Sequence, residues 1–319
     1  MQDKKIYVQI PCFNESENIA KVISDIRLNL DLHSITAFIV VIDDGSDDQT
    51  VEFAKKAGVD HVVMHKRNFG LAKSFQTGIN WCLQQGADLI VNTDGDGQYP
   101  ASGLHEIIIP ILIGEADVVV GDRNTSMVRD FSFLKRLFQK LGTKTTNMLA
   151  GIKINDAASG FRAYSREAAA WIHITSSYTY TLESLVQLGE QPFKIISIET
   201  GRSLVTRPSR LFHSTWQYVL RNGFTLLRVW IQYKPMRFFG SLAIIFLLIS
   251  TLLAVPFTLS YLVGTTSRHT ELFISSGVLL VLTAIFIAIG IIGDGIRAQR
   301  IITQTISQQL RLKKADGSD

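Results

Sequence analysis

The segment of residues 91–100, VNTDGDGQYP, places two carboxylates and one carboxamide on alternate positions directly after an apolar run. Asp94, Asp96 and Gln98 would offer three oxygen ligands from one glycine-containing turn. Such oxygens suit hard divalent cations, Mg²⁺ or Mn²⁺, which take further ligands from phosphate. Two neighbouring carboxylates also repel each other unless a cation lies between them. The turn therefore predicts a divalent metal that carries a polyphosphate.

Two further polar clusters follow short apolar runs, PCFNESEN at residues 11–18 and DDGSDDQT at residues 43–50. In the first cluster, Asn14 and Ser16 are good helix caps, and capping is the simpler interpretation of that cluster alone. In the second cluster one acidic residue would suffice for capping, yet it contains Asp43, Asp44, Asp47 and Asp48. The second cluster therefore favours ligand binding.

The pattern of apolar residues indicates which elements hold these clusters. Apolar, β-branched runs at residues 6–10, 37–42, 61–64, 89–92 and 117–120 alternate with helical patterns at 16–30, 51–57 and 71–85. This alternation predicts an α/β fold with a mostly parallel sheet and helices on both faces. Ligands of such sheets bind outside the carboxyl ends of the strands. All three clusters fall at those ends.

Six strings follow one another in the order and spacing of glycosyltransferase family 2: PCFNE, VIDDGSDDQT, RNFGLAKSFQTGI, DGDGQYP, GDR and SGFRAYSREA. Over residues 6–205 the chain resembles this family. Within it, the chain resembles the polyprenyl-phosphate sugar transferases, such as dolichyl-phosphate mannose synthases and undecaprenyl-phosphate glucosyltransferases. The resemblance implies a Rossmann-like nucleotide-sugar-binding domain. It also implies inverting, Mg²⁺- or Mn²⁺-dependent transfer of a hexose from a UDP- or GDP-linked donor to a membrane polyprenyl monophosphate.

The resemblance also implies roles for individual residues. Donor-binding residues would be Pro11, Asn14, Glu15, Asp43, Asp44 and Asp94. Metal ligands would be Asp94, Asp96 and Gln98, with Asp96 counted among the catalytic residues. Arg123 and Arg162 would be catalytic cations near the acceptor phosphate or the leaving group, joined there by Lys135 and Arg136. For Arg162 a surface ion pair is the structural alternative, and for Lys135 and Arg136 a solvated helix face is the alternative.

The general base is in doubt. Several relatives have an acidic residue directly before the FR pair, where this chain has Gly160, and Asp156 lies four positions upstream. A lipid monophosphate, with a second pKa of about 6, is largely dianionic at pH 7 and attacks without a base. A sugar hydroxyl would need proton removal by a base. Asp156 therefore remains a candidate base that a phosphate acceptor would not require.

Two stretches, residues 238–263 and 272–293, contain no charged residue. Each reaches the roughly 20 residues that a helix needs to cross about 30 Å of hydrocarbon. We expect two transmembrane helices, since helices of this length in a soluble core usually carry charge on one face. Lys and Arg flank the outer ends of the pair, which predicts that both termini and the catalytic domain are cytoplasmic. The expected location is the plasma or inner membrane, or the endoplasmic reticulum in a eukaryote.

The expected organisation has four parts. These are a catalytic domain at 1–206, amphipathic interfacial helices at 207–236, the two spans within 237–296, and a basic cytosolic tail at 297–319. In the interfacial segment, Arg210, Arg221 and Arg228 share one helical face, while Trp216, Leu220 and Trp230 lie on another. Gly240, Gly277 and Gly290 would permit close helix packing in a homo-oligomer. Nucleic acid is not an expected partner, since the basic residues concentrate at the spans.

Two other functions remain open. One is a glycosyltransferase with a sugar or glycolipid hydroxyl acceptor, as in polysaccharide synthesis, a class that typically carries a Q-x-x-R-W motif not found here. The other is a non-catalytic membrane scaffold that has kept the fold. Against the scaffold, no structural requirement explains why Asp94, Asp96 and Gln98 are all present.

Overall fold

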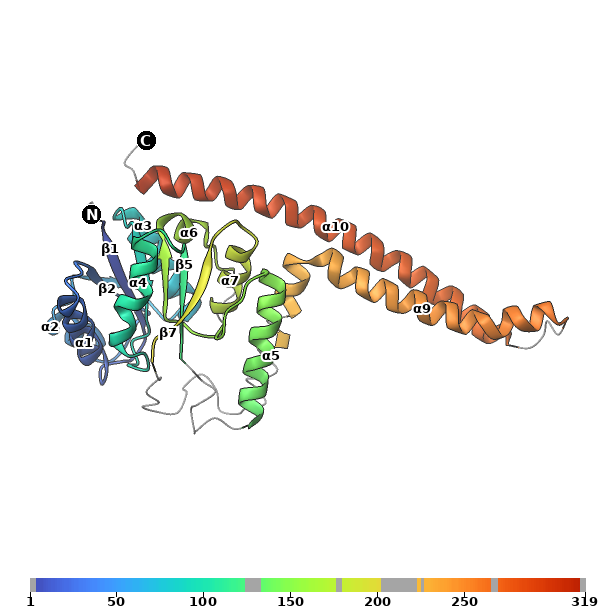
Figure 1. Ribbon diagram of the computed structural model, residues 1–319, viewed down its shortest axis with the longest axis horizontal. Helices are drawn as coiled ribbons and strands as arrows, with labels where there is room; N and C mark the ends of the chain where they lie inside the picture. The colour runs from blue at the N-terminus through green and yellow to red at the C-terminus, as the bar shows by residue number, and fades with distance from the viewer. Residues whose placement is uncertain are drawn as a thin grey trace. The chain divides into compact units, whose positions relative to one another are not determined.

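In the computed structural model, the described residues are 4–123, 133–175, 180–201, 223–224, 227–264 and 269–315, with side chains of 133–139 and 315 excluded (Figure 1). The chain divides into two compact units. The first contains residues 1–226 and 304–319, and the second contains residues 227–303. The last sixteen residues therefore belong with the N-terminal unit and not with the helical segment that precedes them.

Within the described residues, one seven-stranded sheet forms the centre of the first unit. Its strands are β1 (Ile6–Cys12), β2 (Phe38–Asp43), β3 (His61–Met64), β4 (Leu89–Asn92), β5 (Val118–Asp122), β6 (Arg162–Ser165) and β7 (Ile195–Glu199). Their order is β3-β2-β1-β4-β6-β5-β7. All neighbouring pairs are parallel except the two that involve β6. The mostly parallel sheet predicted from the sequence is confirmed.

The antiparallel β6 determines where the chain's polar loops meet. Arg162, its first residue, pairs with Asn92 at the end of β4 and with Val120 near the end of β5. The loop before β6 therefore opens at the same sheet edge as the loops after β1, β2, β4 and β5. This edge carries the three polar clusters noted in the sequence.

Helices cover both faces of the sheet (Figure 1). On one face, α1 (Ile19–Leu32) and α4 (Leu104–Leu112), preceded by the 3-10 turn η1 (Ala101–Gly103), pack against side chains such as Val8 and Val41. On the other, α3 (Leu71–Gln84), α6 (Arg166–Trp171) and α7 (Thr181–Gly189) pack against side chains such as Val40 and Ile90. Neighbouring residues of one strand enter opposite cores because side chains alternate along a strand.

Two more helices complete the unit. The helix α2 (Thr50–Lys56) follows the second polar cluster, and α5 (Phe133–Ala150) packs on α7. The predicted helices match the structure closely except that α1 begins at Ile19, three residues after the predicted start. Residues 13–18 instead form a loop over the end of β1, because their polar groups bond to the second cluster.

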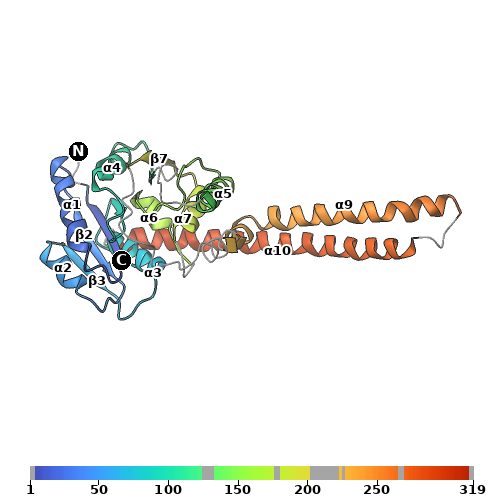
Figure 2. The ribbon, with the colours of Figure 1, turned by 90° about the horizontal axis from the view of Figure 1, so that it is seen from below.

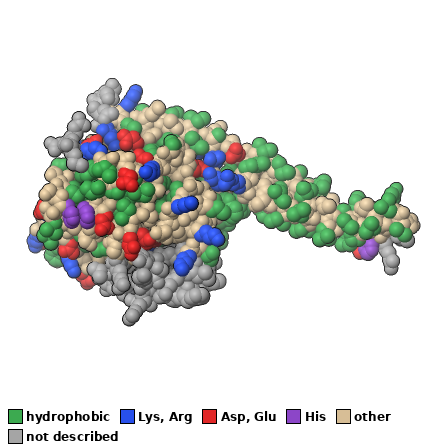
Figure 3. Space-filling view, viewed as in Figure 1, with side chains coloured by type: hydrophobic (Ala, Val, Ile, Leu, Met, Phe, Trp, Pro, Cys, Tyr) green, Lys and Arg blue, Asp and Glu red, His purple; other side chains and the backbone are tan. Residues whose placement is uncertain are grey.

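The second unit contains the helix α9 (Pro235–Leu262) and most of α10 (Thr270–Ala315). Within the described residues these two helices are long and apolar enough to cross a membrane, and only 11% of the most apolar window of each is buried. A core helix of a soluble protein would be mostly buried. Figure 2 shows the two helices side by side, and Figure 3 shows hydrophobic side chains over them on the face in view.

Close contacts at small residues hold α9 against α10. A Cβ added at Gly293 would lie 2.7 Å from the Cβ of Pro235, the first residue of α9. Further along the pair, the hydroxyl of Ser250 donates to the carbonyl oxygen of Ser276 at 2.9 Å. The backbones therefore approach closely at the Pro235 end, and a buried polar contact links the helices further along.

Much of the expected interfacial segment lies outside the described residues, including Arg210, Trp216, Leu220 and Arg221. Residues 227–233 are helical and directly precede α9. There the Trp230 ring contacts Phe238, and the Arg300 guanidinium lies 4.3 Å from the centre of the Tyr233 ring. The expected tail at 297–319 is helical as far as Ala315, since α10 continues without a break.

Candidate active site

The turn after β4 contains the first two expected metal ligands. The Asp94 Oδ1 atom is buried and has no hydrogen-bond partner among the described residues. Asp96 accepts a hydrogen bond from the backbone N–H of Gln98 at 3.0 Å, which shapes the turn. Burial, followed by the nearby Asp96 carboxylate, raises the pKa of Asp94 to about 7. A buried carboxylate oxygen that has no described partner and lies near a second carboxylate is suited to bind a cation.

Two carboxylates and one amide from this turn fit Mg²⁺ or Mn²⁺ as an incomplete oxygen set. Among the residues that the structure describes, no group of three or more His, Cys, Asp or Glu side chains is placed to hold a metal. A cation here would therefore need further ligands, and the oxygens of a diphosphate supply that chemistry.

Arg123, just after β5, is held by Asp156. The two side chains form a paired contact, with Arg123 Nε to Asp156 Oδ2 at 2.7 Å and Nη2 to Oδ1 at 3.0 Å. Burial alone would raise the pKa of Asp156, but the adjacent Arg123 holds it below its usual value. An ionised carboxylate engaged in this way is a poor proton acceptor. The geometry favours a positioning role for Asp156 over the role of general base.

Arg162 is completely buried. Its guanidinium donates to the carbonyl oxygens of Ser159, Thr181 and Ala157 and to the hydroxyl of Ser184, at 2.8 to 3.0 Å. The alternative of a surface ion pair is therefore wrong. The same contacts turn this side chain away from direct binding of an acceptor. They tie the loop before β6 to the start of α7.

The turn of residues 94–98, which holds the expected metal ligands, is called the metal turn below. Three residues beside it were not singled out from the sequence: Asn92, Tyr99 and Tyr180. The Asn92 side chain donates to the Gly160 carbonyl at 2.8 Å and to the Tyr180 hydroxyl at 2.9 Å. The Gly160 N–H donates to the Tyr99 hydroxyl at 2.7 Å, and the Tyr99 ring lies 5.9 Å from the Arg123 guanidinium carbon. Asn92 and Tyr99 stand within the VNTDGDGQYP segment, whereas no local pattern marks Tyr180.

The glycine at position 160 has a steric reason. A Cβ added there would lie 2.6 Å from the Tyr180 hydroxyl and 3.2 Å from both carboxylate oxygens of Asp94. No side chain fits at this position without moving Tyr180 or the metal turn. Packing against Tyr180 and Asp94 thus explains why glycine, and not an acidic residue, precedes Phe161 and Arg162 in this chain.

The first two polar clusters interlock, as neighbouring parallel strands require. The Asn14 N–H donates to the Ser46 hydroxyl, and the Asp47 N–H donates to the Asn14 side-chain oxygen. Asn14 has a left-handed backbone, with φ of 53°. The Ser16 N–H donates to Asp48 at 3.2 Å, which fastens the loop after β1 to the loop after β2. Pro11 and Glu15 are buried at the same place.

The acidic residues of the second cluster hold their own loops. Asp43 accepts from the Ser46 N–H, and Asp44 accepts from the N–H groups of Phe69 and Gly70. His65 Nδ1 lies 2.7 Å from Asp44 Oδ1. Asp44 thus orders the loop of residues 65–70 that leads into α3. The sequence suggested ligand binding for these carboxylates, and the contacts show that they also build the loops.

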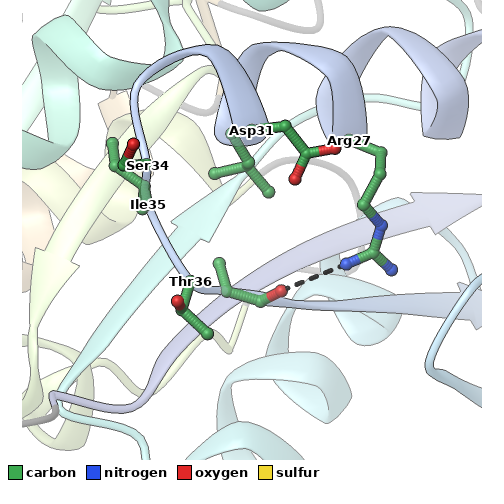
Figure 4. A pocket seen from close by; sticks show the side chains of 7 residues that line it. Arg27, Asp31, Ser34, Ile35 and Thr36 are labelled. Carbon is green, nitrogen blue, oxygen red and sulfur yellow. Dashed lines mark hydrogen bonds between the residues drawn. The ribbon is translucent and has the colours of Figure 1, made fainter.

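Lys135 and Arg136 fall in the first turn of α5, where side chains lie outside the described part of the chain. A small cavity lined by Arg27, Asp31, Ser34, Ile35 and Thr36 lies between the end of α1 and the start of β2 (Figure 4). Because the cavity adjoins the amino end of β2, it lies at the sheet edge opposite the polar clusters.

A mostly parallel sheet with helices on both faces and an Asp-x-Asp turn at its strand ends defines a Rossmann-like α/β domain. Residues 7–171 match the model of glycosyl transferase family 2, and the chain belongs to this family. It is therefore a glycosyltransferase.

Relatives with a named activity include a dolichyl-phosphate transferase and a polyprenol monophosphomannose synthase. The chain is 28% identical to the UDP-N-acetylglucosamine–dolichyl-phosphate N-acetylglucosaminyltransferase of Methanococcus voltae, over 62% of this chain and 88% of the relative. It is 29% identical to the polyprenol monophosphomannose synthase of Mycolicibacterium smegmatis, over 54% of this chain and 66% of the relative.

Solved structures confirm the fold. Glucosyl-3-phosphoglycerate synthase of M. tuberculosis superimposes with a TM-score of 0.53 at 21% identity, over 70% of this chain and 81% of that one. A complex of that Mycobacterium tuberculosis enzyme with Mn²⁺, UDP-glucose and phosphoglyceric acid superimposes with a TM-score of 0.51 at 20% identity, over 70% of this chain and 80% of that one.

Proposed function

We propose that this glycosyltransferase moves a hexose from a UDP- or GDP-linked donor to a polyprenyl monophosphate, with inversion at the anomeric carbon. The observation that carries the proposal is the buried Asp94 Oδ1 atom, which has no hydrogen-bond partner among the described residues and lies beside Asp96, in a chain that also has two helices of membrane-spanning length. The polyprenyl-phosphate transferases among the relatives support the acceptor, and the Mn²⁺ and UDP-glucose complex of a structural neighbour supports the donor.

On this proposal, Asp94, Asp96 and Gln98 hold a Mg²⁺ or Mn²⁺ ion. When bound, the ion neutralises negative charge on the departing nucleoside diphosphate. The nucleotide lies over Pro11, Asn14, Glu15 and Asp43. Asp44 contributes to this site by ordering the loop of residues 65–70.

Arg123 is the proposed anchor of the acceptor phosphate. Asp156 accepts two hydrogen bonds from the Arg123 guanidinium, and the Tyr99 ring lies near it. These contacts orient the guanidinium before the acceptor binds. A phosphate oxygen attacks the anomeric carbon while the bond from that carbon to the nucleotide's diphosphate oxygen breaks. No proton changes hands, which agrees with an Asp156 that serves Arg123 and not the nucleophile. Lys135 and Arg136 remain proposed contributors to this phosphate site, and Arg162 holds the adjoining loop.

The proposed setting is a membrane, with the first unit and both termini on the cytoplasmic side. Lys234, Arg237, Arg297 and Arg300 lie at the Pro235 end of the α9 and α10 pair, whereas the opposite link carries Arg268 and His269. This asymmetry follows the positive-inside rule. Pairing between copies through Gly240 or Gly277 is also a proposal, since a Cβ at either would meet no described atom within 4 Å.

The test is transfer of radiolabel from a panel of UDP- and GDP-sugars into lipid, using membranes that contain the protein, undecaprenyl or dolichyl phosphate, and Mn²⁺. We expect one donor to give a lipid product that EDTA abolishes and that mild acid cleaves. Label in a polysaccharide or glycolipid, without a phosphate-linked product, would contradict the proposed acceptor.

A variant pair tests the metal turn. Asp96→Asn should lower turnover by a factor of about 10²–10³, because it removes charge from the cation site. Asp25→Asn, at an exposed position on α1, is the matched control and should retain full turnover. Equal activity of the two variants would remove Asp96 from the mechanism.

A further inference from the structure

The last turns of α10 pack on the first unit, to which they belong. Gln304, Gln308, Arg311 and Leu312 recur at the spacing of one helical face, and this face is the less exposed one. Leu312 packs against the core that includes α6 and α7. The Gln308 side chain donates to the Glu167 carbonyl in α6 at 3.1 Å. The end of α10 is thus a structural part of the first unit.

Arg311 bonds to the end of α6. Its Nη1 donates to the carbonyl oxygens of Ile172 at 2.6 Å and Ala170 at 3.3 Å, and its Nη2 donates to His173 Nδ1 at 3.2 Å. The last carbonyl groups of a helix lack partners within the helix and carry partial negative charge. A guanidinium placed there satisfies them and fixes the direction in which the chain leaves α6.

The segment that leaves α6, residues 172–175, is held by side chains on both sides. Gln187 of α7 accepts from the His173 N–H and donates to the His173 carbonyl. Gln76 of α3 accepts from the Ile174 N–H at 2.7 Å, and Glu183 accepts from the Thr175 hydroxyl at 2.6 Å. Each of these bonds requires residues 172–175 to run in one fixed direction.

The helices that hold this segment also hold Tyr180. Phe75, the neighbour of Gln76 in α3, stacks on the Tyr180 ring with centroids 3.9 Å apart, and Tyr180 directly precedes α7. The Tyr180 hydroxyl accepts a hydrogen bond from the Asn92 side chain. A Cβ at Gly160 would contact both the Tyr180 hydroxyl and the Asp94 carboxylate, so these two groups lie close together. A shift of residues 172–175 would therefore move the Tyr180 ring, which contacts the turn of Asp94 and Asp96.

We propose that the C-terminal end of α10 is a positioning element of the active site, in which Arg311 fixes residues 172–175 and thereby Tyr180 against the metal turn. Arg311 touches no reacting group in this scheme. The kinetic part of the proposal rests on the proposed sugar transfer, whereas its structural part stands without it.

The test uses the full-length protein in lipid nanodiscs, with Arg311→Ala and the exposed Lys314→Ala as its control. Hydrogen–deuterium exchange should become faster at residues 172–182 in Arg311→Ala and stay unchanged at residues 43–50. With an active donor and lipid, kcat should fall about tenfold while KM for the donor stays within twofold. Lys314→Ala should match the wild type in both measurements.

Arg311→Lys adds a rescue, because an ammonium group still donates to the Ile172 and Ala170 carbonyls, so it should recover part of the lost kcat. If Arg311→Ala does not fold, Gln308→Ala and Arg311→Lys provide the graded series. Unchanged exchange at residues 172–182 would overturn the proposal. So would a fall in kcat that merely follows loss of folded protein. If no donor gives a product, the proposed function fails, and the exchange result still decides the positioning role.

Discussion

At the scale of single residues, Asp94 combines properties that folding alone would not favour. Its Oδ1 atom is buried without a described partner, and burial together with Asp96 raises its pKa to about 7. An unfolded chain would ionise this carboxyl near pH 4. Ionising it in the folded protein without a cation therefore costs stability, and a bound cation offsets that cost.

The sign of the resulting pH dependence follows from the raised pKa. In metal-free protein, the stabilising contribution of protonated Asp94 is present below about pH 4 and is lost as pH rises through about 7. We expect the gain in thermal unfolding temperature on adding Mn²⁺ to increase between pH 5 and 8. Measurements with EDTA or Mn²⁺ across this range check it. If the Mn²⁺ effect in Asp94→Asn equalled that in the wild type at every pH, the expectation would be contradicted.

Sequence reasoning located this turn because alternating oxygen-bearing residues after an apolar run are visible in a single window. It could not locate the environment of Arg162. The four groups that bind its guanidinium lie at residues 157, 159, 181 and 184, and their convergence depends on how β6 joins the sheet. The sequence therefore suggested that Arg162 binds a ligand, whereas in the structure its guanidinium binds groups of the protein itself.

At the scale of elements, the contact between Gly293 and Pro235 sets how α9 approaches α10. Two positions further along α10, a Cβ at Gly295 would meet no described atom within 4 Å. The two glycines differ in packing while sharing residue type and helix. They therefore form a matched pair for measuring what this contact contributes.

Gly293→Ala should destabilise the helix pair by about 1–3 kcal/mol, because the added methyl overlaps Pro235. Gly295→Ala should stabilise it by up to about 1 kcal/mol through reduced backbone freedom in the unfolded state. Thermal unfolding of both variants in one detergent gives the comparison. Opposite signs are expected, and equal shifts would show that the helices do not meet at Gly293.

Most strands and helices were predictable because their apolar periods are local. The strand β6 was not predicted, and its antiparallel direction could not be, since a four-residue strand has the same pattern in either direction. The docked end of α10 was also missed. Its inward face, Gln304, Gln308, Arg311 and Leu312, has one apolar residue among four, so hydrophobic periodicity did not separate it from a basic tail.

At the scale of the whole molecule, the proposed membrane orientation can be tested with cysteines. Cys12 and Cys82 are both buried, so neither should react with a membrane-impermeant maleimide in the native protein. Glu271→Cys, beside the link between the spans, should be labelled in intact cells. Lys314→Cys should be labelled only after permeabilisation, because basic flanks place it inside. The reverse pattern would invert the topology, and labelling of both from one side would exclude two spans.

The position of β6 also bears on how this protein folds. β4 and β5 do not pair with each other, since β6 lies between them and runs against both. In the described sheet, the strands β3-β2-β1-β4 are joined to β5-β7 through residues 162–165, and contacts so distant in sequence form slowly. Pairing of the same residues brings the loop of Asp156 and Gly160 between Asp94 and Arg123. We therefore expect the catalytic centre to assemble in the step that closes the sheet, so that a partly folded chain carries no partial activity.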